Sequence, residues 1–530
     1  MALFYIVTLP AKYVLLYLVV PWVLVVVFYR VALHPLRKYP GPFWAKITHG
    51  YGGVHAMGQK PHIHVYQNFK KYGPVYREGP NRLVFNSLSS IRDIYSNPNI
   101  TKSRAYHNFR WLEKEGLFDT QDKAEHTRRR KIIGQAVSDR MIRNFEPTLI
   151  IQIDVFLRLM LDASRQRKVI DVTVPIKRLA VDIIGHLAFG YALNTLTETD
   201  HRFLPDALGG SIFIANLCYT WATFSWILPV IGYLARSKLK VYIAALRKFM
   251  LARMAQPADA KADFYSIAKG QLSLEGDNLA KSELWQEAIF FITAGGSTVG
   301  TAMAGTLFHL SRHSDWYAKV AQEVRTSFNS GDEIRNGPVL AGCKYLRAAI
   351  DESLRLSPPS LLSLWRTADP KVNQPFVVDG NIIPPKTEVA VNLWSIYHTP
   401  EYFPEPFCYR PDRWLAPEKG EGPNPLQADE VKEIMKQANV GFGLGDRNCA
   451  GKSMAYLETS IFIAKILWYF DFKVAPGEAG KLGAGEEGSP YPWGGPEQFQ
   501  LRDIIAADHD GPNLVFTTRD NYWQDLEAKN

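Results

Sequence analysis

The chain has 530 residues, of which 47% are hydrophobic, 12% aromatic and 21% charged, and its formal net charge is +9. This composition excludes a disordered or low-complexity chain, and its 4 cysteines are too few for a disulfide framework, which favours a reducing compartment. The mild basic excess suits a membrane surface, an acidic protein partner or RNA, and does not choose among them.

The amino terminus is strongly apolar. From Tyr13 to Tyr29 the only ionisable groups are tyrosines, and as a helix this stretch spans about 25 Å. The apolar residues before Lys12 extend it toward the roughly 30 Å of a hydrocarbon core. We predict that residues 1–33 form a retained membrane anchor, kinked at Pro21, because the stretch is too long for a cleaved signal peptide and no small-residue cleavage site follows it.

Charges around the anchor predict its orientation. Arg30, Arg37 and Lys38 follow it, whereas Lys12 alone precedes it. The positive-inside bias therefore places the carboxyl-terminal side in the cytosol. Residues 34–42 are rich in proline, so we expect a stiff, non-helical linker there.

Helical periodicity dominates the rest of the chain. Apolar residues recur every three or four positions in 148–162, 175–190, 240–256, 283–312, 315–327, 344–356 and 452–467. Strand-like segments are short, at 74–78, 82–86, 376–378, 388–392 and 513–517. The Gly- and Pro-rich segments 417–427 and 475–497 are expected to be surface loops. We predict a mainly α fold with small β-sheets, forming one large catalytic domain over 43–530.

Two polar features in the first third of the chain have simple interpretations. His62 and His64 are interpreted as a surface feature rather than a metal site. The run EHTRRRK at 125–131 is most simply a solvated helix face, with RNA binding as a weak alternative.

Two further patterns are ambiguous when taken alone. Gly295 and Gly296 lie inside the helical segment 283–312, where each costs about 1 kcal/mol relative to alanine. Close helix packing would explain them. Glu352 and Arg355 are three residues apart and so share a helix face; an isolated pair of this kind is usually a solvated surface ion pair.

The segment 441–451, GFGLGDRNCAG, is the most informative part of the sequence. It is not a dinucleotide-binding loop, because the position of the third glycine holds Asn448 and no strand precedes it. It places Cys449 at the mouth of an apolar helix, among glycines that allow the backbone to approach a flat ligand. The helix dipole and free N–H groups predict a lowered pKa for the Cys449 thiol, and Arg447 is placed to reach an anionic group on the same ligand.

Five positions of this segment, Phe442, Gly445, Arg447, Cys449 and Gly451, match F-x-x-G-x-R-x-C-x-G. The chain thereby resembles the cytochrome P450 family of haem-thiolate monooxygenases. The resemblance implies haem b (iron protoporphyrin IX), with Cys449 as the ligand of the iron. It also implies that Phe442 packs beside the sulfur of Cys449 and that backbone amides beyond Cys449, such as that of Gly451, surround this sulfur. Arg447 would pair with a haem propionate.

Other motifs of the family follow in order. Glu352 and Arg355 match E-x-x-R, and Arg413 lies in Pro411–Trp414, which matches the family's P-x-R-W/F segment. The resemblance implies a buried structural cluster of Glu352, Arg355 and Arg413 that supports the proximal side of the haem.

The stretch from Ala294 to Thr298 matches the family's A-G-x-[D/E]-T pattern with one departure, because Ser297 replaces the acid. In the family this segment opens the helix locally over the haem, and Thr298 matches the threonine used in activating dioxygen. Ser297 is able to relay protons through water but supplies no charge, which puts the usual proton path in doubt.

Basic residues complete the resemblance, which covers about residues 30–520 and is greatest for fungal members. His126 and Arg130 match propionate contacts, and Arg366 matches a third. The neighbouring cations, with Lys452, would form a positive surface for an acidic electron-donor protein.

The resemblance implies a single-pass protein of the endoplasmic reticulum membrane with its catalytic domain in the cytosol. NADPH–cytochrome P450 reductase, with cytochrome b5 as a further possible donor, would supply electrons for hydroxylation or epoxidation of a lipophilic small molecule. By analogy, that molecule belongs to fungal terpenoid, alkaloid or polyketide biosynthesis; nucleic acid is not an expected partner. The uncharged, aromatic segment 210–230 is either a core helix or the roof of the substrate pocket.

Two alternatives stay open. In one, Ser297 marks a haem enzyme that isomerises, dehydrates or couples substrates without inserting oxygen. In the other, the chain is a non-catalytic membrane haem or ligand-binding protein.

Overall fold

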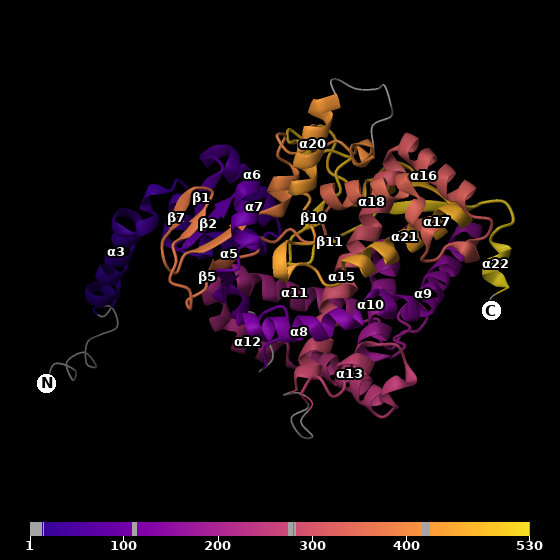
Figure 1. Ribbon diagram of the computed structural model, residues 1–530, viewed down its shortest axis with the longest axis horizontal. Coiled ribbons are helices and arrows are strands. Elements are labelled where there is room, and N and C mark those ends of the chain that lie inside the picture. Colours follow the sequence, from indigo (N-terminus) through magenta and orange to yellow (C-terminus); the bar gives the residue numbers. More distant parts are fainter. Residues whose placement is uncertain are drawn as a thin grey trace.

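The computed structural model describes residues 13, 15–108, 114–273, 279, 282–415 and 425–528. Helices make up most of it. The strands β1, β2, β5 and β7 lie at the end that carries the N-terminal helix α3, whereas β10 and β11 lie near the middle of the view (Figure 1). The longer helices are α8 (Lys123–Ala136), α9 (Asp139–Arg165), α10 (Thr173–Phe189), α11 (Leu204–Thr220), α13 (Arg236–Met254), α15 (Glu283–Arg312), α16 (Ser314–Ser327), α18 (Lys344–Leu356), α20 (Pro425–Ala438) and α21 (Lys452–Tyr469). The shorter ones are α3 (Val20–Phe28), α4 (Phe43–Ile47), α5 (Gly50–Met57), α6 (Pro61–Tyr72), α7 (Leu88–Tyr95), α12 (Leu228–Leu234), α14 (Phe264–Ala268), α17 (Pro338–Gly342), α19 (Leu393–Tyr397) and α22 (Gln524–Glu527).

The strands form small sheets. One sheet has the order β1-β2-β8-β5-β3, a second β4-β12-β9, and the hairpins β6-β7 and β10-β11 stand apart. In chain order the strands are β1 (Val75–Gly79), β2 (Arg82–Phe85), β3 (Ile100–Lys102), β4 (Val169–Asp171), β5 (Arg366–Ala368), β6 (Phe376–Val378), β7 (Asn381–Ile383), β8 (Glu388–Val391), β9 (Phe470–Val474), β10 (Leu501–Arg502), β11 (Asp508–His509) and β12 (Asn513–Thr518). The mainly α fold with small sheets is confirmed.

Helix α15 is the central element, and it packs against α10, α18 and α21. Gly295 explains the close approach of α10, since a Cβ there would lie 2.6 Å from Cδ1 of Ile184. The helix is continuous from Glu283 to Arg312, without a break at the glycines. Close packing therefore accounts for Gly295, and the local opening expected from the family pattern is not seen.

The N-terminal helical stretch projects from the body (Figure 1). It is π-helical at Leu15–Val19 and Tyr29–Leu33 and α-helical between them, with Pro21 in the first turn of α3. Residues 16–33 are apolar, unburied and long enough to cross a membrane. Helix α15 is also long and apolar enough to cross a membrane, but it is mostly buried, as expected of a core helix.

The linker differs from the expected spacer. Residues Pro35–Lys38 form one 3-10 turn, and Leu36 and Tyr39 are buried in the core beside the large sheet. The Pro40 carbonyl accepts a hydrogen bond from the amide of Arg77 in β1 (2.8 Å). The proline-rich segment is thus packed onto the body, because Leu36 and Tyr39 bury their apolar side chains in the core there.

Two other expectations are corrected. His62 is buried, 4% exposed, rather than on the surface; in the described part of the chain no group of His, Cys, Asp or Glu side chains is arranged to hold a metal. Most of the segment 417–427 lies outside the described residues, but from Pro425 onward the chain is helix α20 rather than loop.

Candidate functional site

A cavity of about 1360 Å³ lies in the helical part of the molecule. Its wall is mainly apolar and comes from α8, α10, α11, α13, α15, α21 and the 441–451 loop. Phe442, Cys449 and Gly451 line it from the loop, and Ala294 and Thr298 line it from α15. The structure therefore brings the cysteine motif and the threonine motif to one space.

The loop geometry explains its glycines. Gly443 and Gly445 have φ of +75° and +73°, a left-handed conformation that favours glycine. A Cβ on Gly445 would lie 2.1 Å from the carbonyl oxygen of Tyr95 in α7. Gly445 thus permits a close approach to α7, rather than to a ligand as its position in the motif suggested. The turn is closed by the Cys449 amide, which donates to the Phe442 carbonyl (2.7 Å).

The thiol of Cys449 faces the cavity. The Gly451 amide and the charges of Arg130 and Lys452 favour its thiolate, but burial outweighs them and raises the pKa. The lowered pKa predicted from the helix dipole is therefore wrong for the free thiol, because the prediction left out desolvation. Binding to a metal cation deprotonates a coordinating thiol regardless.

Cations gather on one side of the cavity. Lys102, His126, Arg130 and Arg447 line it, and Arg366 is buried nearby. Burial, with the charges of Arg447, Lys102, Arg130 and Arg366, lowers the pKa of His126 to about 2. His126 is therefore a neutral ring among basic groups. Asp446 lies 3.6 Å from Nε of Arg447, and burial, with the charges of Arg447 and Arg366, lowers the pKa of Lys102 well below its ordinary value.

Each guanidinium of the cluster is tied to the fold. Arg447 Nη1 donates to the Thr120 carbonyl (3.0 Å), and Arg130 Nη2 donates to Asn448 Oδ1 (2.6 Å) beside the cysteine. An apolar cavity with a thiol on its wall and a cluster of cations at one side fits a flat metal complex that carries carboxylates. Haem has these properties, so the described residues fit the group.

The two predicted catalytic residues are placed differently. Thr298 lines the cavity, whereas Ser297 is not among its lining residues in the described part of the chain. The Thr298 hydroxyl donates to the Ala294 carbonyl (2.7 Å), which leaves its oxygen lone pairs free to accept a proton or hydrogen bond. A direct role in the cavity is therefore open to Thr298 and not to the side chain of Ser297.

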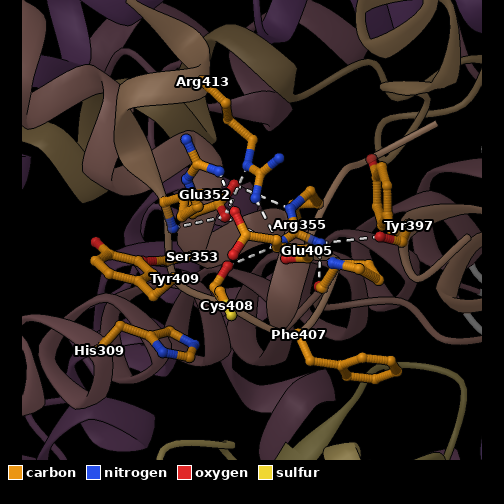
Figure 2. A network of polar contacts seen from close by, with 12 residues as sticks. His309, Glu352, Ser353, Arg355, Tyr397, Glu405, Phe407, Cys408, Tyr409 and Arg413 are labelled. Carbon is orange, nitrogen blue, oxygen red and sulfur yellow. Dashed lines mark hydrogen bonds and ion pairs between the residues drawn. The ribbon is translucent and has the colours of Figure 1, made fainter. Parts of the chain in front are cut away.

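The third predicted group, Glu352, Arg355 and Arg413, is brought together (Figure 2). Glu352 and Arg355 form two hydrogen bonds, of 2.9 and 2.8 Å, and Arg413 Nε lies 3.1 Å from Glu352 Oε1. Trp414 Nε1 also donates to Glu352 (2.9 Å). Arg355 extends the cluster to the carbonyls of Tyr397, Pro406 and Cys408. The set fixes α18 to the chain segment that precedes the cysteine loop.

Two buried groups near the site were missed from the sequence. Lys102 lies in a short strand without any motif, so no local signal marked it. The sequence predicts a solvated face for Arg129, yet it is 3% exposed and pairs with Glu287 (2.8 Å) and Glu283 (2.9 Å) of α15. Glu283 and Glu287 are four residues apart in an otherwise apolar helix. This spacing is the sequence feature from which a buried ion-pair network could have been predicted.

Comparisons with known proteins agree with this geometry. The family model described as "Cytochrome P450" matches residues 40–485. The chain is 32% identical to "Cytochrome P450 monooxygenase poxM" of Penicillium oxalicum over 92% of this chain and 91% of that protein. It is 31% identical to "Cytochrome P450 monooxygenase atnE" of Emericella nidulans, over 92% and 93%. The crystal structure of the cytochrome P450 CYP102L1 superposes with a TM-score of 0.68 at 18% identity, covering 87% of this chain and 94% of that one.

Proposed function

The chain belongs to the cytochrome P450 family and is a monooxygenase, and on that premise we propose that it hydroxylates or epoxidises a lipophilic small molecule. The proposal rests on one observation: Cys449 opens into a large apolar cavity beside a cluster of cations. We further propose that the family's haem is haem b, which when bound supplies dioxygen activation and oxygen insertion.

The residues of the chain have distinct tasks in this proposal. Cys449 binds the haem iron, and Phe442 packs beside the cysteine. The haem carboxylates are oriented by four side chains: Arg130, His126, Arg366 and Arg447. Thr298 holds a proton at its hydroxyl oxygen within the cavity. The chain segment that precedes the cysteine loop is held in place by Glu352, Arg355 and Arg413.

The cavity wall suggests the substrate class. Its α11 and α12 residues include Phe213 and Ile231, and between them the segment 222–227 forms a 3-10 turn. Trp226 and Leu234 are 80% and 77% exposed, which suits a roof that enters the bilayer and admits a lipophile. The relatives suggest a fungal secondary metabolite; terpenoids, alkaloids and polyketides are the classes we propose.

Partners and location follow from the same premise. Residues 1–33 form the anchor in the endoplasmic reticulum membrane, 34–42 the linker and 43–530 the cytosolic catalytic domain. NADPH–cytochrome P450 reductase supplies electrons over a surface that includes Lys452, with cytochrome b5 as a second donor. The sequon at Asn99 tests the orientation, because a cytosolic Asn99 stays unglycosylated in microsomes and a glycan there contradicts the topology.

Oxygen-18 labelling tests the reaction. Lipophilic candidates are first screened for a spin-state shift of the haem, and a binding compound is then turned over with reductase and NADPH under ¹⁸O₂. One labelled oxygen atom in the product supports oxygen insertion. A product without the label supports the isomerase, dehydratase or coupling alternative, and NADPH consumption that substrate does not change supports the non-catalytic one.

A further inference from the structure

Helix α11 forms one wall of the cavity and ends at Thr220. Its residues Ile212, Phe213 and Ala215 line the cavity, so the position of α11 helps to set the shape of that space. Among the described residues, neither the 3-10 turn 222–227 nor α12 contains a buried side chain. The chain that follows α11 therefore gives the end of the helix little packing, and contacts with other elements hold it in place.

Arg82 in β2 binds the carboxyl-terminal end of α11. Its Nη1 donates to the Thr220 carbonyl (2.7 Å), and its Nη2 donates to the Tyr219 carbonyl (3.2 Å). Carbonyl groups in the last turn of a helix lack intrahelical donors and form the negative end of the helix dipole. The guanidinium of Arg82 satisfies both requirements, so Arg82 caps α11 from a strand of the five-stranded sheet.

The sheet in turn fixes the guanidinium. Arg82 Nε donates to Oε2 of Glu388 (2.6 Å), and Glu388 is paired with Arg82 in the neighbouring strand β8. The guanidinium carbon lies 4.8 Å from the centroid of the Trp365 ring, and Arg82 is 4% exposed. Arg82 therefore joins the end of α11 to a buried, fixed point in the sheet.

We propose that Arg82 is a positioning residue for substrate binding: by capping α11 from the sheet, it holds the α11 wall of the cavity in the arrangement that fits a large lipophilic ligand. Arg82 acts through α11, because it is not among the described residues that line the cavity. The inference rests on the proposed function, since it concerns the cavity assigned there to substrate.

Loss of the cap is expected to weaken the binding of large ligands. Without Arg82 the end of α11 takes up other arrangements, and the apparent affinity falls with the fraction of molecules whose wall fits the ligand. A ligand too small to reach α11 is not affected by this fraction. The proposal thus predicts an effect that depends on ligand size, which general destabilisation of the protein does not produce.

Two iron ligands of different size test this in the holoenzyme, with binding followed by the absorption spectrum. Tebuconazole is a triazole large enough to reach the cavity wall, whereas imidazole is not. Arg82→Met is combined with Glu388→Met, because the single change would strand a buried carboxylate. The Kd of tebuconazole is expected to rise about tenfold, as for one lost charged hydrogen bond, and that of imidazole to change by less than about twofold.

Arg82→Lys is a second variant that keeps a positive charge beside Glu388. It lacks the planar fork that spans the two carbonyls of α11 and Glu388, so its Kd for tebuconazole is expected to rise about threefold. This variant leaves the proposal falsifiable if the double variant does not fold.

Arg77→Met is the matched control in the same hairpin. Arg77 in β1 is fully buried, and its guanidinium likewise donates to carbonyls, but to those of Arg30 (2.9 Å) and Pro80 (2.7 and 3.2 Å) rather than of α11. Wild-type Kd values are expected for both ligands. An unchanged tebuconazole Kd in the Arg82 variants, an equal loss for imidazole, or an equal loss in Arg77→Met would overturn the proposal.

Hydrogen–deuterium exchange separates this inference from the proposed function. The amide of Trp221 donates to the Leu217 carbonyl (2.8 Å) in the last turn of α11. Amides of 217–221 are expected to exchange about tenfold faster in the double variant than in the wild type, and at the wild-type rate in Arg77→Met. Absence of any tebuconazole band in the wild type would count against the haem site alone, whereas wild-type exchange in the double variant would count against the role of Arg82.

Discussion

Lys102 and Arg366 are directly paired across the antiparallel strands β3 and β5, and both are 5% exposed. Like charges opposite each other in a sheet repel, and here their hydrogen bonds go to neutral acceptors. Lys102 Nζ donates to the carbonyls of Leu117 (3.0 Å) and Phe118 (2.7 Å), and Arg366 Nη1 donates to the Tyr106 hydroxyl (2.8 Å). Burial, with the charges of Arg447 and Arg366, lowers the pKa of Lys102 well below its ordinary value, so an anion bound beside the pair would favour its charged form. We propose that the carboxylates of haem are this anion.

Arg366→Leu is therefore expected to release haem faster than the wild type. A lost charged hydrogen bond corresponds to a roughly 10- to 100-fold faster release, measured as haem transfer from the holoenzyme to excess acceptor apoprotein. Lys473→Met, which removes an exposed cation from β9, serves as the control and is expected to retain haem normally. Equal release rates in Arg366→Leu and Lys473→Met would contradict the propionate role.

Thr298→Ala is expected to uncouple the reaction, because the hydroxyl that holds a proton in the cavity is removed. The product formed per NADPH consumed is expected to fall roughly tenfold while NADPH is still consumed. Thr293 is a matched control: it also lines the cavity, and its hydroxyl likewise donates to a carbonyl one turn earlier, at Ile289. Equal loss of coupling in Thr293→Ala would refute a specific role for Thr298.

Glu352→Gln is expected to destabilise the protein by about 3–5 kcal/mol, because it strands the buried charges of Arg355 and Arg413. The loss is measured as a lower thermal unfolding midpoint of the holoenzyme. Glu433 in α20 pairs with Lys436 at 3.7 Å on the surface, so Glu433→Gln is expected to change stability by less than about 1 kcal/mol. A wild-type midpoint for Glu352→Gln would contradict the structural role.

Gly295→Ala is expected to destabilise the protein by about 1–3 kcal/mol, since the new methyl group collides with Ile184. Adding Ile184→Val, which removes Cδ1, is expected to restore part of the loss. Gly209 in α11 has nothing within 4 Å of an added Cβ, so Gly209→Ala is expected to gain up to about 1 kcal/mol of helix propensity. Stability equal to the wild type in Gly295→Ala would contradict the packing account.

Sequence patterns predicted the parts of the fold that depend on periodicity. The segment 283–312 coincides with α15 and 344–356 with α18. The run 125–131 lies in a helix, α8, as the sequence predicts, but that helix face is partly buried rather than solvated. Arg129 pairs with Glu287 of α15, so burial there depends on ion pairing and not on hydrophobicity. The strands β3 (ITK) and β5 (RTA) were missed because each contains a basic residue, Lys102 or Arg366, and lacks an apolar run like FVV in β6, which was predicted.

The residues of the candidate site likewise fall into those that the sequence predicted and those that it did not. The positions in motifs, such as Cys449 and Thr298, were named from the sequence, and both line the cavity. Lys102 had no motif, because its place in the site comes from burial and from partners farther along the chain. The pKa of Cys449 was predicted in the wrong direction, since desolvation depends on packing that local sequence does not contain.

The central claim, that Cys449 binds haem iron through its sulfur, is tested most directly by the carbon monoxide difference spectrum of the reduced protein. The wild type is expected to give the red-shifted band of a thiolate-ligated haem, and Cys449→Ser is expected to lose that band. Absence of the band in the wild type, or its survival in Cys449→Ser, would contradict the assignment.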